Sequence, residues 1–248
     1  MHSIRLRKTL APLAAAAALL AGCGGGNDGP LPPTVAASFT AEGYWVGSTS
    51  AGWSFNLAVL ETGETWGLYY SGSTIFGALS GKATWTTTAL SGSGTEFIFP
   101  PRSVVASTFS GGYTRKASMS FQTSGGASAS TSYAPLYDAP INLALVAGSF
   151  NGPTVTAKSN LLNQTLTVDT AGSIRGGTTG CGITGVILPR PSAKGVFNLF
   201  INLDGQLCPI GTTGPKQGLA VYDPAERRLL LISTTEDKKD GFFYVGTR

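Results

Sequence analysis

The stretch Trp53-Ser-Phe-Asn-Leu-Ala-Val59 carries the pattern that predicts the fold. Its large apolar residues occupy every second position, and smaller or polar residues fill the positions between them. Successive side chains of a β-strand point to opposite faces of the sheet, so this alternation predicts a strand with one buried face and one polar face. The stretch Phe197-Asn-Leu-Phe-Ile-Asn-Leu203 is similar, and Leu166 and Val168 alternate with polar residues in a third.

The composition of the whole chain favours the same class. Charged residues make up 12% of the sequence, and 34 of the 248 residues are glycine. Short alternating runs recur between Gly-rich turns, which is typical of antiparallel sandwiches and barrels. We therefore expect an all-β fold of antiparallel meander sheets or small barrels. One short helix is predicted near 140–147, where Pro140 suits a first helical position and Asp138 or Ala139 could provide the cap.

A weak internal repeat predicts the domain organisation. Gly43-Tyr-Trp-Val-Gly47 and Gly148-Ser-Phe-Asn-Gly152 are each followed by a longer strand and a turn with an acidic residue and glycine. We interpret the copies as two similar β lobes, 40–126 and 141–248, joined by a Ser/Gly/Ala-rich linker over 127–140. Chance similarity in Gly-rich sequence and a single larger barrel are the alternatives.

The N-terminus has the pattern of a targeting segment. Positive charges at Arg5, Arg7 and Lys8 precede an apolar run over 10–21, which is shorter than the roughly 20 residues that a membrane-spanning helix needs. A basic start, a short apolar middle and small residues at its end predict a signal peptide over 1–22.

The four residues Leu20-Ala-Gly-Cys23 resemble the lipobox of bacterial lipoproteins. This resemblance implies a diacylglyceryl group on the Cys23 thiol, cleavage before Cys23, and acylation of the new amine by a chain such as palmitate. The alternative is an ordinary signal peptide that leaves Cys23 free. Residues 23–39 are rich in Gly and Pro and are expected to form a tether. By the same resemblance, the absence of Asp at position 24 favours the outer membrane.

Removal of the signal peptide excludes several classes of function. His2 is the only histidine in the sequence, so the mature chain has no Ser-His-Asp or Cys-His nucleophile system and no histidine ligand for a metal. We expect no metal and no cofactor. The mature chain keeps fourteen basic and thirteen acidic side chains, because three of the seventeen basic residues precede Cys23. Such a balance leaves no basic surface for nucleic acid.

Two cysteines remain, Cys181 and Cys208. An exported chain in an oxidising compartment is expected to pair them in a disulfide, the alternative being two free thiols. The stretch Gly180–Gly185 matches GxGxxG, but the residues that follow it favour a strand where a dinucleotide site needs a helix. We therefore predict turn glycines beside a disulfide, and no nucleotide.

Aromatic residues cluster between positions 44 and 85, where all four tryptophans lie. Adjacent aromatic residues in a strand point to opposite faces, so one member of each pair could lie outside the core. The resulting candidate for a binding patch consists of Tyr44, Trp45, Tyr69 and Tyr70, with core packing as the alternative. Glu61 and Glu64 flank a Thr-Gly turn, and we interpret them as a solvated hairpin tip in preference to an acid–base pair.

The lipobox, the tether, the strand–turn pattern and the repeated lobes together resemble the transferrin-binding-protein-B-like β-barrel surface lipoproteins of Gram-negative bacteria. The resemblance implies a lipid-anchored protein of the cell envelope that is held to the membrane by its N-terminal lipid. We expect a non-catalytic binding module for a protein or glycan ligand. A structural or assembly component of the outer membrane is the second hypothesis, and a histidine-free carboxylate enzyme is a remote third.

Overall fold

The computed structural model describes residues 40–208 and 215–248, without the side chains of residues 160–162. The signal peptide, Cys23 and the tether lie outside these residues. No helix in the described ranges is long and apolar enough to cross a membrane.

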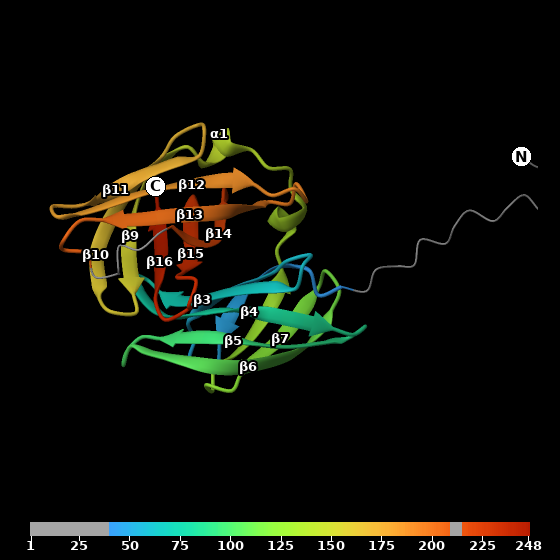
Figure 1. Cartoon of the computed structure of the whole chain (residues 1–248). Coiled ribbons are helices and arrows are strands. Elements are labelled where there is room, and N and C mark those ends of the chain that lie inside the picture. Colours follow the sequence, from blue (N-terminus) through green and yellow to red (C-terminus); the bar gives the residue numbers. More distant parts are fainter. Residues whose placement is uncertain (1–39, 209–214) are drawn as a thin grey trace, which may run out of the picture. The chain divides into compact units, whose positions relative to one another are not determined.

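The N-terminal half forms a closed antiparallel barrel in which each strand pairs with the next one along the chain, and β8 pairs with β1 (Figure 1). This arrangement confirms the predicted meander. The strands are β1 (Gly43–Thr49), β2 (Ser54–Val59), β3 (Glu64–Ser71), β4 (Thr74–Trp85), β5 (Ala89–Ile98), β6 (Ser103–Thr114), β7 (Ser118–Thr123) and β8 (Ser128–Tyr133).

The C-terminal half forms a second closed antiparallel barrel, which β9 and β16 close. Two β lobes are therefore present, and a single larger barrel is not. The strands are β9 (Gly148–Thr156), β10 (Asn160–Val168), β11 (Ser173–Thr178), β12 (Cys181–Pro189), β13 (Val196–Asp204), β14 (Lys216–Asp223), β15 (Arg228–Thr234) and β16 (Gly241–Thr247).

The two sequence repeats mark the first strand of each barrel. The second glycine of each copy lies where the first strand meets the last: a Cβ atom on Gly47 would lie 1.9 Å from the Ser130 carbonyl oxygen, and one on Gly152 would lie 1.9 Å from that of Val245. No side chain fits at these distances. The repeat thus identifies the seam at which each sheet closes on itself.

The boundary between the lobes differs from the expected one. The segment 127–140, expected to be a linker, contains β8 and the short 3₁₀ helix η1 (Pro135–Asp138). The first barrel therefore extends to Tyr133, because it needs β8 to close.

The expected helix is a single turn, α1 (Leu143–Val146), and its cap is Asn142, whose Oδ1 accepts a hydrogen bond from the Ala144 N–H at 3.0 Å.

Apolar side chains gather in three clusters. One fills the first barrel, one fills the second, and the third lies between the two barrels. In the third cluster, the Phe97 and Phe99 rings of the first barrel pack on Phe243 of the second, with ring centroids 4.9 and 5.8 Å apart. An eight-stranded barrel has an interior just wide enough for side chains to fill. Large buried side chains fill the first interior accordingly: Trp45, Phe55, Leu57, Tyr69, Leu79, Phe109, Met119 and Phe121.

Candidate binding surfaces

The four aromatic side chains of the candidate patch are buried. Trp45 and Tyr69 point into the first barrel, whereas Tyr44 and Tyr70 lie in the cluster between the barrels. Each is at most 4% exposed. Adjacent residues do point to opposite faces, but both faces of these strands are covered. These four residues therefore do not form an exposed patch.

The buried phenols between the barrels form a hydrogen-bonded chain. The Tyr44 hydroxyl donates to Asn56 Oδ1 at 2.8 Å, and Asn56 Nδ2 donates to the Tyr70 hydroxyl at 3.2 Å. The Arg228 guanidinium of the second barrel also donates to the Tyr70 hydroxyl. Burial raises the pKa of Tyr44, and the neighbouring Tyr70 adds to this effect. Tyr44 is therefore a neutral hydrogen-bond donor that helps to join the barrels.

A buried carboxyl group, which the sequence pattern did not single out, lies inside the first barrel. Glu96 is 1% exposed. It accepts hydrogen bonds from the hydroxyls of Tyr69, Ser107 and Thr123, each at 3.1 Å. The alternation along β5 was the available signal. Leu90 points inward, and Glu96 follows it at an even spacing in the same strand, so its side chain points to the same face. The three hydroxyls satisfy both carboxyl oxygens, and such satisfaction makes burial of the group tolerable.

The carboxylates of the predicted hairpin tip have separate partners. Glu61 Oε1 lies 2.9 Å from Arg190 Nη2, which belongs to the second barrel. Burial acts to raise the pKa of Glu61, but the hydrogen bond and the charge of Arg190, together with further hydrogen bonds to the carboxylate, outweigh it and lower the pKa. Glu64 Oε1 accepts a hydrogen bond from the Trp66 indole N–H at 2.9 Å. A carboxylate kept ionised by a guanidinium is a poor general acid.

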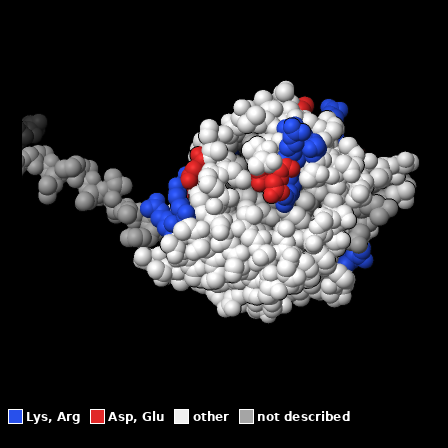
Figure 2. Space-filling model, turned by 180° about the vertical axis from the view of Figure 1, so that it is seen from behind, with Lys and Arg blue, Asp and Glu red and all other residues white. Residues whose placement is uncertain are grey.

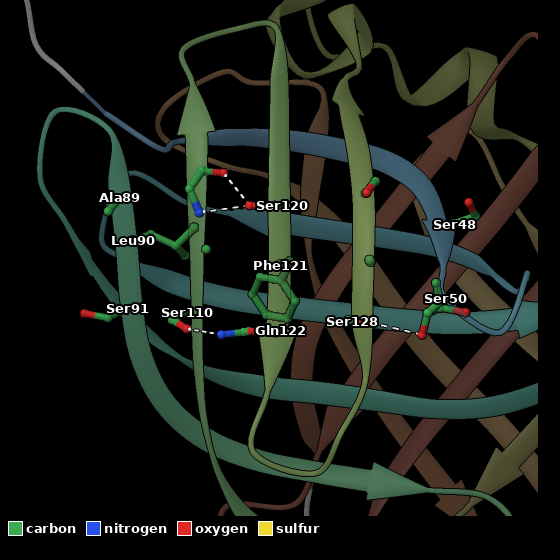
Figure 3. Close-up of a pocket in the computed structure, with 15 residues that line it drawn as sticks. Ser48, Ser50, Ala89, Leu90, Ser91, Ser110, Ser120, Phe121, Gln122 and Ser128 are labelled. Atoms are coloured by element: carbon green, nitrogen blue, oxygen red, sulfur yellow. Dashed lines mark hydrogen bonds between the residues drawn. The ribbon is translucent and has the colours of Figure 1, made fainter.

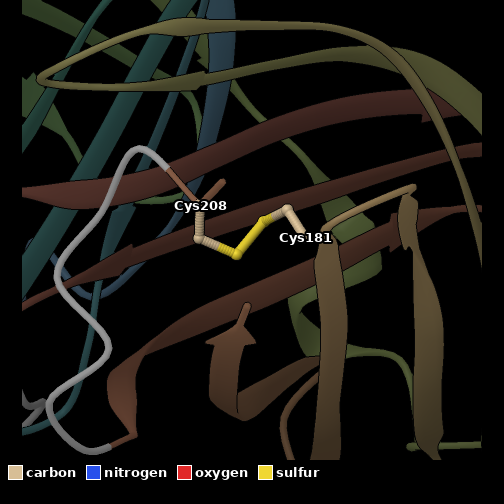
Figure 4. Close-up of a disulfide and its surroundings, with 2 residues drawn as sticks. All are labelled: Cys181 and Cys208. Atoms are coloured by element: carbon tan, nitrogen blue, oxygen red, sulfur yellow. A yellow bond between two sulfur atoms is a disulfide. The ribbon is translucent and has the colours of Figure 1, made fainter. Parts of the chain in front are cut away.

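The predicted disulfide is present between Cys181 and Cys208 (Figure 4). The Cα atoms lie 4.8 Å apart, within the range that a disulfide allows. Gly180 occupies the turn between β11 and β12, where its φ of +83° favours glycine. Strand β12 begins at Cys181, directly after this turn. The GxGxxG glycines therefore belong to a β-hairpin and not to a strand–helix junction.

A broad depression on the first barrel has a volume of about 820 Å³. It extends over β5, β6, β7, β8 and β1, and Figure 3 shows its hydroxyl-bearing side chains spread over neighbouring strands. None of the lining residues is charged. They are Ser48, Thr49, Ser50, Ala89, Leu90, Ser91, Ser110, Gly111, Gly112, Ser120, Phe121, Gln122, Ser128, Ala129 and Ser130.

Hydrogen bonds between side chains organise the surface of this depression. Gln122 Nε2 donates to Ser110 Oγ at 3.3 Å, and Ser128 Oγ donates to Ser50 Oγ at 3.0 Å (Figure 3). The Ser120 hydroxyl bonds to both the N–H and the carbonyl of Gly112, at 3.2 and 3.3 Å. These hydrogen bonds hold part of the polar lining in place. A second depression of about 790 Å³ continues from the first and shares Ser91, Ser110 and Gln122 with it.

Charge is sparse elsewhere on the molecule as well. Figure 2 shows one face on which Lys, Arg, Asp and Glu occupy only small areas among uncharged residues. Within the described ranges, no group of three or more His, Cys, Asp or Glu residues could hold a metal ion. No protein-family profile matches the chain, and no curated protein matches it either.

Proposed function

We propose that this chain is a lipid-anchored protein of the cell envelope that acts as a non-catalytic binding module, and that it binds its ligand on the outside of the first barrel. The observation that carries this proposal is the pair of filled barrels beside a broad, uncharged depression. Side chains occupy the interiors where a small ligand could otherwise lie. The outer depression offers fixed hydroxyl and amide groups without charge, which suits a neutral glycan or an uncharged protein surface.

The anchor is proposed from the sequence around Cys23, and the disulfide is in keeping with an oxidising compartment outside the cytoplasm. Cells that express the full chain with labelled palmitate are expected to label it, and Cys23→Ser is expected to abolish the label. The tether would then present the barrels at the membrane surface, where the outer membrane is the proposed location. Persistence of the label in Cys23→Ser would contradict the lipobox assignment.

The binding surface can be tested with the chain from residue 40 onward, immobilised and exposed to envelope proteins and, separately, to envelope polysaccharide. Ser91→Arg and Ser130→Arg place a bulky charge on exposed positions that line the depression. Ser149→Arg, on the exposed face of β9, is the matched control. We expect the two arginine variants on the depression to lose the envelope protein or polysaccharide that the parent chain retains, and the control variant to keep it. Retention by all three variants would show that the depression is not the binding surface.

A structural or assembly role in the outer membrane is the second candidate. The low charge of the surface in Figure 2 is compatible with contacts to other envelope proteins. Deletion of the protein would then increase the sensitivity of the cells to detergent. A binding module would lose only its ligand, with the envelope barrier intact.

A further inference from the structure

A further, more enclosed cavity lies between the two barrels and has a volume of about 500 Å³. Strand β15 contacts β3 in this region, and β16 contacts β4. Small-molecule sites commonly lie where two lobes meet and have volumes of roughly 300–1,000 Å³. The lining residues are Glu64, Trp66, Ser80, Gly81, Pro215, Lys216, Gln217, Thr234, Thr235, Glu236 and Lys238.

The floor of this cavity contains a buried cation. Lys216 is 1% exposed, and burial lowers its pKa, with attraction to Asp240 acting in the opposite direction. Asp240 is 5% exposed, and its Oδ1 accepts hydrogen bonds from the N–H groups of Ala157 and Gly241, both at 2.8 Å. The two backbone N–H groups thus fix the Asp240 carboxyl group, and the charge of Asp240 attracts the Lys216 ammonium group. Trp66, which is 5% exposed, adds an apolar wall.

The rim brings further charges of both signs to the cavity. Lys238 reaches from the β15–β16 turn to the Ser80 Oγ of the first barrel, at 3.5 Å. Glu64 also lines the cavity, and one of its oxygens is held by the Trp66 indole N–H. Glu236 is exposed on the same turn as Lys238. Two ammonium groups and two carboxylates therefore line one cavity, and their charges come from both barrels.

We propose that this cavity is a binding site for a small zwitterion of the amino-acid or short-peptide class. The ligand carboxylate would lie towards Lys216 and Lys238, and the ligand ammonium group towards Glu64 and Glu236. A simple anion would be repelled by the two glutamates, and a simple cation by the two lysines. A zwitterion satisfies both pairs, and its apolar side chain would contact Trp66. This site is independent of the depression on the first barrel, since the two share no lining residue.

The test uses alanylalanine and its two blocked forms, N-acetyl-alanylalanine and alanylalanine amide, as probes of the chain from residue 40 onward. Binding is measured by calorimetry and by the shift of the Trp66 indole N–H resonance, assigned with Trp66→Phe. We expect alanylalanine to bind and to shift this resonance. Each blocked form is expected to bind at least about tenfold more weakly, which corresponds to the loss of one hydrogen bond to a charged group.

Variants separate the site from the fold. Lys238→Gln lies on the exposed rim and leaves the core intact, whereas Lys216→Met changes a buried residue and is used only if it folds. Lys239→Gln is the matched control, because its side chain is 84% exposed and does not line the cavity. We expect Lys238→Gln and Glu64→Gln to weaken alanylalanine binding and Lys239→Gln to leave it unchanged. The proposal is overturned if alanylalanine does not bind or if all three probes bind equally well. It is also overturned if Lys238→Gln binds alanylalanine as tightly as the parent chain does.

Discussion

At the scale of single residues, the closure of each barrel depends on a glycine. Gly47 and Gly152 occupy equivalent positions on β1 and β9, and a carbonyl oxygen of the closing strand lies where a side chain would begin. In both cases the contact involves backbone, which cannot turn aside as a side chain can. The second glycine of each sequence repeat therefore reflects a requirement of the seam.

Substitution of Gly47 by Ala is expected to destabilise the protein by about 1–3 kcal/mol, the range typical of overpacking, because the Ser130 carbonyl must move. The free energy of unfolding from denaturant titration measures the effect. Gly182→Ala is the matched control, since the nearest atom to its Cβ would lie 3.5 Å away. A loss in the control as large as that in Gly47→Ala would show that the seam has no special role.

Glu96 gives a second prediction at this scale. Glu96→Leu removes the acceptor of three hydroxyl groups. The Ser107 hydroxyl keeps hydrogen bonds to the Thr108 carbonyl and to Ser124, so the loss falls mainly on Tyr69 and Thr123, at about 1–3 kcal/mol for a buried hydroxyl left without an acceptor. Glu96→Gln keeps one acceptor oxygen, and the Ser107 or Thr123 hydroxyl can turn to accept from the new amide. We expect the leucine variant to unfold at a clearly lower denaturant concentration than the glutamine variant. Equal midpoints would mean that the hydroxyl network contributes nothing to stability.

At the scale of elements, the disulfide restrains the part of the second barrel between β12 and the end of β13. Its cysteines are 27 positions apart in the sequence. In the chain-entropy model, loss of such a cross-link costs about 3–4 kcal/mol. The double variant Cys181→Ala/Cys208→Ala is therefore expected to unfold at lower denaturant concentration than the oxidised protein. The oxidised chain from residue 40 onward should also show no titratable thiol after denaturation, and two thiols would contradict the assignment.

Strands with large apolar residues at alternate positions could be predicted from the sequence, as the stretches 53–59 and 197–203 show. Strand β8 could not, because its Ser, Thr and Ala side chains carry little hydrophobic signal. Period-two alternation also could not show that the outer faces of β3 and β4 would be covered by a second barrel. For that reason Tyr44 and Tyr70 were candidates for an exposed patch.

At the scale of the whole molecule, Asp138 connects both barrels through the segment between them. Its carboxylate lies 2.6 Å from Lys116 Nζ of the first barrel and 3.4 Å from Lys194 Nζ of the second. The Tyr133 hydroxyl also donates to it at 2.8 Å. Although burial acts to raise the pKa of Asp138, these contacts lower it below its ordinary value of 3.8.

A lowered pKa in the folded state means that ionised Asp138 stabilises the fold above its unfolded pKa, near 3.8. This contribution is lost as the pH falls through the lower folded value. The pairs are partly exposed, so we expect less than about 1 kcal/mol at neutral pH. Asp138→Asn should therefore show a smaller loss of stability than the parent chain between neutral pH and about pH 3. Parallel curves for the free energy of unfolding against pH would contradict this role.

The pairing of the first strand of each barrel with its own last strand bears on the order in which the chain can assemble. The strands that pair with one another in the first barrel all lie before residue 134, so that barrel can close before the rest of the polypeptide has folded. The outer face of β3 to β5 stays exposed until β14 to β16, which come last in the sequence, pack against it. Folding thus includes a stage in which an apolar surface of the first barrel is exposed, and this stage ends only when the final strand is in place.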